Sequence, residues 1–142
     1  MMDAVTWTSE LGARIFTIVK TSLTDNGIME RYPTLQFVSP DKQYIPSDFP
    51  TVWIREIQSI EMGNDLDNTT INAVSENIQV DVISRERQIS RRVMSEVVVE
   101  FKKLRFNLNA LPLSREDELK AYCFARFNRT ICYNDALITG NT

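Results

Sequence analysis

The sequence of 142 residues contains no histidine, two cysteines and only four glycines. The lack of histidine excludes Ser-His and Cys-His nucleophile pairs and every metal site that needs an imidazole ligand. The four glycines form no glycine-rich run, so the common phosphate-binding loops are also excluded. Any enzyme built on this chain would depend on carboxylates. We therefore predict that the protein is not an enzyme and has no cofactor.

Long apolar runs are also missing, since none approaches the roughly 20 residues that cross a bilayer. No membrane association is expected. Asp3 and Glu10 stand where a signal peptide would carry positive charge, which favours a mature, intracellular protein. Cys123 and Cys132 are an odd number of positions apart in one expected strand. They should lie on opposite faces of that strand as free thiols.

The bulk composition is that of an ordinary folded domain, with 43% hydrophobic and 25% charged residues. A chain of this length can bury a core without disulfides. We expect a single domain over residues 1–133 and a loose tail over 134–142. The formal net charge of -3 gives no general reason to bind nucleic acid, because such binding depends on Lys and Arg neutralising phosphates.

The spacing of apolar residues predicts an α+β fold. The expected elements are a helix over about 4–24, strands over 34–39, 51–62 and 72–84, a helix over about 85–106, and a strand over 118–131. Residues 107–117 are expected to be a connector. This order, α-β-β-β-α-β, predicts a mostly antiparallel sheet of about four strands with two helices packed on one face. The other face would carry polar, aromatic and charged side chains.

The segment "FPTVWIREIQSIEM" predicts a long strand without a clean alternation of apolar residues. Val52 and Ile54 share one face, whereas Ile57 lies on the other. A bulge near Glu56, or burial on both sides, would explain the change. Aromatic residues on such a sheet more often pack than bind. However, joint exposure of Trp53 with Tyr122 and Phe124, from the last expected strand, would indicate a partner surface.

Two charged regions were candidates for a site. The best carboxylate cluster is Glu61, Asp65 and Asp67, which could meet a hard cation through oxygen ligands. It lacks the spacing of a calcium loop with its terminal glutamate, so we predict a solvated turn and no metal.

The second region is basic. Residues 85–105 hold seven basic and three acidic residues, a local +4, so the remainder, with nine basic and sixteen acidic residues, carries -7. Arg85, Arg87, Arg91 and Arg92 lie near the start of the second expected helix, where cations oppose the helix dipole. An anionic partner would relieve this cost. A solvated helix face, a protein interface and a nucleic-acid contact all remain possible interpretations.

Several sequence segments, in their order along the chain, resemble those of one protein family. They are "RYPTLQFVSP", "DFPTVWIREI", "SENIQVDVIS", "RERQISRRVMSEVVVEFKKLRF" and "AYCFARFNRTI". The chain resembles the tail terminator proteins of long, non-contractile-tailed phages, also called tail completion or tail-to-head joining proteins, which include the minor tail protein of the lambda type. The resemblance covers about residues 5–133.

The resemblance implies a virion structural protein at the head-proximal end of the tail. Such a subunit forms a hexameric ring on the tail tube, ends polymerisation of the tube protein and meets the head connector or neck protein. DNA passes through the ring without specific binding. The candidate interface with neighbouring subunits or the tube comprises Trp53, Arg55, Glu56, Glu61, Asp65, Asp67, Arg87, Arg91 and Arg92.

Other functions remain open from the residues. One is a neck or head-completion ring protein on the portal side. Another, of a different class, is a small nucleic-acid-binding α+β module, because double-stranded RNA binding domains also combine a helix, three strands and a second helix. A carboxylate enzyme is the least supported.

Overall fold

The computed structural model describes residues 4–38, 50–61, 73–116, 120–132 and 134–135. In chain order the elements are α1 (Ala4–Asp25), α2 (Ile28–Arg31), β1 (Gln36–Val38), β2 (Thr51–Glu61), β3 (Ala73–Ser84), α3 (Arg87–Lys103), β4 (Asn107–Glu116) and β5 (Ala121–Cys132). The predicted α+β class is confirmed. Both long helices and three of the four expected strands lie close to their predicted positions, while the strand expected over 34–39 is reduced to the three residues of β1.

The described residues form a five-stranded sheet in the order β1-β2-β3-β5-β4. β1 is parallel to β2, and the other three pairings are antiparallel, so the sheet is mixed. The prediction of about four strands was wrong because the expected connector over 107–117 contains β4. β4 lies at the edge of the sheet, where Pro112 is tolerated because an edge strand leaves some N–H groups unpaired.

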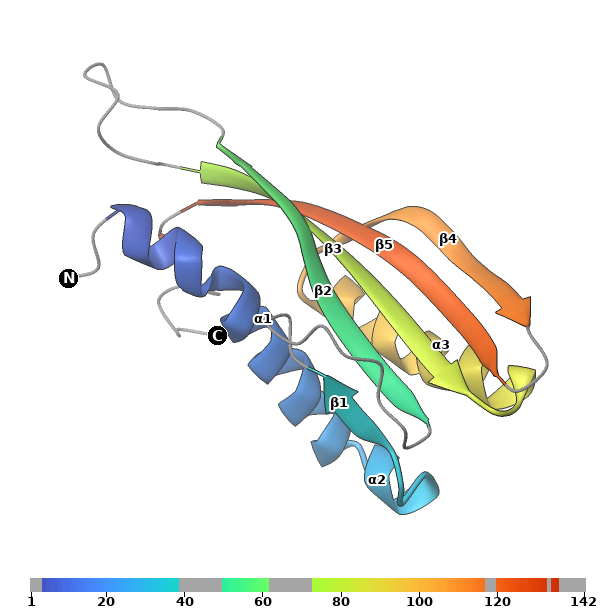
Figure 1. Cartoon of the computed structure of the whole chain (residues 1–142). Coiled ribbons are helices and arrows are strands. Elements are labelled where there is room, and N and C mark those ends of the chain that lie inside the picture. Colours follow the sequence, from blue (N-terminus) through green and yellow to red (C-terminus); the bar gives the residue numbers. More distant parts are fainter. Residues whose placement is uncertain (1–3, 39–49, 62–72, 117–119, 133, 136–142) are drawn as a thin grey trace.

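Helices α1 and α3 pack against each other and cover the same face of the sheet. In Figure 1 the strands cross in front of α3, and β1 lies in front of the C-terminal part of α1. The core lies between the helices and this face. Its sheet contribution comes from alternate residues of the central strands: Val52, Ile54, Val74, Ile78, Val80, Val82, Cys123, Ala125, Phe127 and Ile131.

Helix α1 forms because its apolar residues recur every three or four positions. Leu11, Ile15, Val19 and Leu23 are all buried, and Trp7 extends their stripe toward the N-terminus. The helix ends where predicted. Gly27 adopts a left-handed conformation with φ 82°, which glycine reaches without a steric penalty. The short helix α2 follows directly.

Helix α3 is fixed to the sheet by an aromatic cluster. The Phe101 ring stacks on Phe127 of β5 with 4.3 Å between ring centres, and Phe106 meets Phe101 edge-on at 5.3 Å. All three side chains are fully buried. Stacked and edge-to-face rings add to the free energy gained by burying their area. The C-terminal half of α3 is therefore anchored more firmly than burial alone would achieve.

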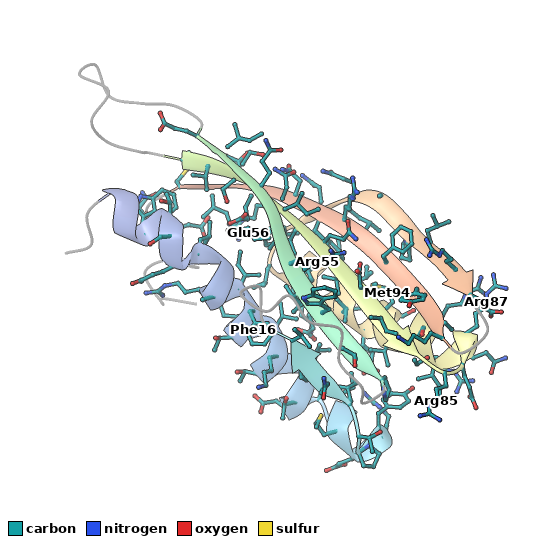
Figure 2. All side chains as sticks on the ribbon, in the orientation of Figure 1. Phe16, Arg55, Glu56, Arg85, Arg87 and Met94 are labelled. Carbon is teal, nitrogen blue, oxygen red and sulfur yellow. The ribbon has the colours of Figure 1, made fainter. Side chains whose placement is uncertain are left out.

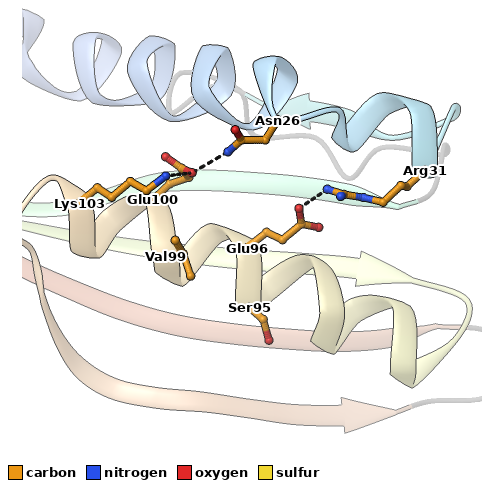
Figure 3. Close-up of a pocket in the computed structure, with 7 residues that line it drawn as sticks. All are labelled: Asn26, Arg31, Ser95, Glu96, Val99, Glu100 and Lys103. Carbon is orange, nitrogen blue, oxygen red and sulfur yellow. Dashed lines mark hydrogen bonds and ion pairs between the residues drawn. The ribbon is translucent and has the colours of Figure 1, made fainter.

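A buried carboxylate joins the two long helices. Glu100 of α3 accepts hydrogen bonds from Ser22 Oγ at 2.5 Å, Asn26 Nδ2 at 3.0 Å and Lys103 Nζ at 3.1 Å. Figure 3 shows Asn26, Glu100 and Lys103 beside the ion pair between Arg31 and Glu96. A hollow of about 360 Å³ lies between them, and Val99 also lines it. Glu100 thus fixes the end of α1 against α3.

The irregular apolar pattern of β2 arises from a bulge. The pairing with β3 shifts between Glu56 and Gln58, which confirms the bulge expected near Glu56. Before the shift, Val52 and Ile54 point into the core, whereas Ile57 at the shift is 48% exposed. The bulge changes which alternate residues of β2 face the helices.

The two cysteines lie as predicted. Cys123 is buried, Cys132 is exposed, and both are free thiols. Burial raises the pKa of the Cys123 thiol above its ordinary value. Of the predicted C-terminal tail, Asp135 forms an ion pair with Arg129 of β5, whereas residues 136–142 lie outside the described residues. No helix among the described residues is long and apolar enough to span a membrane.

Candidate interaction surface

The face of the sheet opposite the helices is a polar and aromatic surface, which we call the open face. Side chains alternate between the two faces of a strand, so the residues between the core positions of β3 and β5 point here. In the described part of the chain, no helix packs on this face. Its members on these two strands are Ser75, Asn77, Gln79, Asp81, Tyr122, Phe124, Arg126 and Asn128.

The strand register arranges the open face in rows across the sheet. One row contains Trp53, Asp81, Phe124 and Leu113, the next contains Arg55, Gln79 and Arg126, and a third contains Asn77, Asn128 and Asn107. Directly opposed residues lie close enough to interact. The surface therefore changes along the strands from aromatic and apolar, through charged, to amide side chains.

The row of Arg55, Gln79 and Arg126 forms a connected set of contacts with Trp53 and Asp81 of the neighbouring row. The Arg55 guanidinium lies over the Trp53 ring, 4.6 Å from its centre, and Arg55 Nη2 donates to Asp81 Oδ2 at 2.5 Å. Gln79 Nε2 donates to the other oxygen of Asp81 at 2.9 Å, and Arg126 Nε donates to Gln79 Oε1 at 3.0 Å. These contacts hold long side chains in fixed rotamers. A partner would then meet a surface whose side-chain entropy is already reduced.

Two donors in this set have no acceptor in the described part of the chain. They are the indole Nε1 of Trp53 and Nε of Arg55, both shielded from water. Buried N–H groups in native proteins are nearly always hydrogen-bonded. Both donors belong to side chains of β2 that stack on each other, since the Arg55 guanidinium lies over the Trp53 ring. An oxygen acceptor at this position would satisfy them.

The open face is also hollowed near its aromatic end. A hollow of about 330 Å³ is lined by Gln79, Asp81, Arg115, Tyr122 and Phe124. The Arg115 guanidinium lies 5.9 Å from the centre of the Tyr122 ring. Among the described residues of the strands, three arginines, Arg55, Arg115 and Arg126, share the open face with one aspartate, Asp81, so this part of the face has an excess of positive charge.

The structure separates the residues that were predicted to act together on β2. Trp53 and Arg55 lie on the open face. Glu56 reaches the opposite side, where its carboxylate approaches Gly12 of α1; Figure 2 labels Arg55 and Glu56. Glu56 is thus on the other face from Trp53 and Arg55, because adjacent strand residues point to opposite faces, and its contact with a neighbouring subunit or the tube stays a prediction. Glu61 is exposed at the end of β2. Asp65 and Asp67 lie outside the described residues.

The predicted basic residues of α3 lie elsewhere, at the end where β3 turns into the helix (Figure 2). Arg87 is 3.9 Å from Glu116, and Arg91 Nε donates to Ser114 Oγ at 3.0 Å, so both reach toward β4. Arg92 is exposed. These arginines form a second charged surface, distinct from the open face.

Sequence reasoning missed the central residues of the open face, namely Gln79, Asp81 and Arg126. The polar alternation of β3 was visible in the sequence, but the alignment of these residues with Arg55 depends on the strand register. Among the described residues, no three His, Cys, Asp or Glu side chains are grouped so that they could hold a metal ion. Comparison of the sequence with protein-family models and with curated proteins found no match.

Proposed function

We propose that this protein is a structural subunit of a phage virion. It forms a ring, most simply a homohexamer, on the head-proximal end of a long non-contractile tail. The ring ends polymerisation of the tail tube protein and provides the joint to the head connector or neck protein. It is made in the host cytoplasm, acts in the virion, binds no membrane, and lets DNA pass through its opening without specific binding.

The observation that carries this proposal is the open face. Trp, Tyr and Arg are the residues most often responsible for binding energy in protein interfaces. Here Trp53, Tyr122, Arg55 and Arg126 lie on one sheet face, and the contacts around Asp81 fix their arrangement. The buried donors of Trp53 and Arg55 add a demand for acceptors. A neighbouring protein surface rich in carboxylates and carbonyl groups meets these requirements.

The charge distribution supports assembly from identical copies. Outside residues 85–105 the chain carries -7, whereas the open face and the start of α3 each present clustered arginines. A ring requires two different surfaces on each subunit that fit each other. Positive patches that meet acidic surfaces of the next copy would set the orientation of the subunits. The long strand β2 would then serve both the core and the assembly surface.

Microscopy of particles tests the proposal. The gene is disrupted in the phage that encodes it, and the lysate is imaged by negative stain. We expect filled heads without tails, beside tail tubes that are overlong or irregular at one end. Unstable filled heads with normal tubes would instead assign the protein to the neck, on the portal side. Normal virions would overturn both assignments.

A nucleic-acid-binding module is the second candidate, because aromatic and arginine side chains on an open sheet also bind single strands. Stacking of bases needs accessible ring faces. Arg55 already lies over Trp53, and Arg115 lies near Tyr122, which favours the protein interface. Filter binding at low salt separates the two candidates. Retention of single strands or duplex by the purified protein, lost in Trp53→Ala, would support the nucleic-acid function.

A further inference from the structure

The core contains a glutamate, Glu76, which lies apart from the open face. Glu76 of β3 is fully buried on the helix-covered side of the sheet. Its Oε1 accepts a hydrogen bond from Ser59 Oγ at 2.8 Å, whereas Oε2 is buried without a partner in the described residues. An ionised carboxylate with one oxygen unsatisfied in this position would be very unfavourable. The geometry requires either a proton or a cation there.

The bulge in β2 brings a second carboxyl group to the same place. Glu56 precedes the bulge and Ser59 follows it, and both reach the helix-covered side. The register places Glu56 opposite Ile78, diagonal to Glu76 on the same face, a separation that long side chains can bridge. Glu56 Oε2 would be only 2.9 Å from a Cβ added to Gly12, so the absence of a side chain on α1 makes room for it.

Two neighbouring carboxyl groups cannot both ionise readily, because their negative charges repel. Two causes raise the pKa of Glu76 from 4.5 to about 9. The larger is burial, and the second is the contact with Glu56. The hydrogen bonds from Ser59 and the Asn77 backbone oppose this shift only in part. A protonated Glu76 can donate its O–H to the Glu56 carboxylate, which satisfies the buried oxygen.

The charged groups around the pair do not neutralise it. Arg129 of β5 is directly opposite Glu76 in the register. Among the described contacts, however, its guanidinium donates to the Leu104 carbonyl at 2.9 Å and to the Asp135 carboxylate. On α1, Glu10 and Arg14 are two positions from Gly12, about 200° around the helix, and so point away from the pair. On β2, Glu61 is exposed at the end of the strand.

We propose that Glu56 and Glu76 share one proton where α1, β2 and β3 meet, and that release of this proton separates the two carboxylates and loosens α1 from the sheet. The proton leaves to solvent by way of Glu56, which is exposed at its outer end. The released state has two neighbouring negative charges, of which that of Glu56 lies against Gly12. α1 is then held mainly by α3 and by Glu100 at its far end.

The direction of the pH dependence follows from proton linkage. The pKa of Glu76 is higher in the folded chain than its ordinary value of 4.5, so folding takes up a proton in the window between 4.5 and about 9. The stabilisation is complete below the ordinary pKa and is lost as the pH rises through the folded pKa. Within the window, the folding equilibrium constant should fall by up to about tenfold per pH unit through this group.

The test measures denaturant unfolding of the full chain from about pH 5 to about pH 10. Wild type is compared with Glu76→Gln, whose amide donates to Glu56 without titrating, and with the matched control Glu61→Gln on the same strand as Glu56. We expect Glu61→Gln to follow wild type, and Glu76→Gln to gain stability over wild type progressively as the pH rises. Glu56→Gln should reduce the pH dependence only in part, because burial still raises the pKa of Glu76, and it provides the comparison if Glu76→Gln does not fold.

Hydrogen exchange locates the effect. At the top of the pH range, amides in the first half of α1 should exchange faster in wild type than in Glu76→Gln at the same pH. Parallel pH profiles of stability for wild type and Glu76→Gln would overturn the shared proton. Stabilisation of wild type but not Glu76→Gln by calcium chloride at about pH 8 would also overturn it, because a cation would then occupy the pair.

Discussion

The two faces of the sheet come from the same strands, yet they differ in nearly every physical respect. The covered face consists of Val, Ile, Phe and other apolar side chains buried beneath α1 and α3. The open face consists of aromatic rings, amides and charged side chains, and hydrogen bonds connect Arg55, Asp81, Gln79 and Arg126. The covered face fixes the fold of one subunit. The open face is the surface that we propose binds a partner.

This contrast predicts unequal effects of mutation. Changes on the covered face should lower stability strongly, and assembly only as a consequence. Changes on the open face should affect assembly with little loss of stability. Glu76 is the exception, because it is a carboxyl group on the covered face, and its titration should be visible in stability.

The largest effect is expected for Phe101→Ala on the covered face. This change removes the ring that stacks on Phe127 and meets Phe106, and it leaves a cavity under α3. The free energy of unfolding should fall by about 3–5 kcal/mol. Urea unfolding followed by circular dichroism measures it. A loss well below 1 kcal/mol would show that the aromatic cluster does not anchor α3.

A smaller loss is expected for Glu100→Ala, at the junction of the two covering helices. The change leaves Ser22 and Asn26 without their shared acceptor. The free energy of unfolding should fall by about 1–3 kcal/mol, because the donors are partly buried. Hydrogen exchange should increase at the C-terminal end of α1. Lys102→Ala, an exposed change two positions away on the same helix, is the control and should leave both measurements near wild type.

On the open face, Asp81→Asn should cost about 1 kcal/mol or less. It removes the charge that pairs with Arg55, whose side chain is 37% exposed and therefore partly screened by solvent. The main consequence should be reduced assembly. Comparison of melting temperature with ring formation separates the two effects. A folded Asp81→Asn variant that assembles as wild type would remove the open face from the interface.

The smallest change in stability is expected for the double charge reversal Arg91→Glu and Arg92→Glu. Both residues are exposed on α3, and the free energy of unfolding should change by about 0.5 kcal/mol or less. Assembly should weaken if this basic surface meets an acidic neighbour. Sedimentation of the variant with tail tubes measures this. Unchanged assembly would show that the start of α3 is only a solvated face.

The sequence predicted the covered face better than the open face. Helices α1 and α3 are each specified by an apolar stripe of their own. In α1, helical spacing brings residues such as Leu11, Ile15 and Val19 to one side, whichever element packs against it. β4 could not be recognised, since Pro112 and two shifts in its pairing with β5 disrupt a regular strand pattern. Packing at the sheet edge overrides the weak local preference.

The candidate site was predicted only in part. Trp53 and Arg55 on one face and Glu56 on the other follow from plain alternation ahead of the bulge, whereas the face of Ser59 depends on where the bulge falls. The contacts of Asp81 with Arg55 and of Gln79 with Arg126 link strands that are far apart in sequence. Such contacts require the strand register, which the alternation of side chains does not determine.

The most direct test of the open face as an assembly surface is complementation of the gene-disrupted phage. Electron microscopy compares particles supplied with wild type, with Arg55→Ala/Arg126→Ala on the open face, or with the control Arg14→Ala/Lys102→Ala on the helix side. Circular dichroism first establishes that each variant is folded. We predict that the control restores normal virions, while the folded open-face variant leaves tailless filled heads and overlong tubes. Normal virions with the open-face variant would contradict the account.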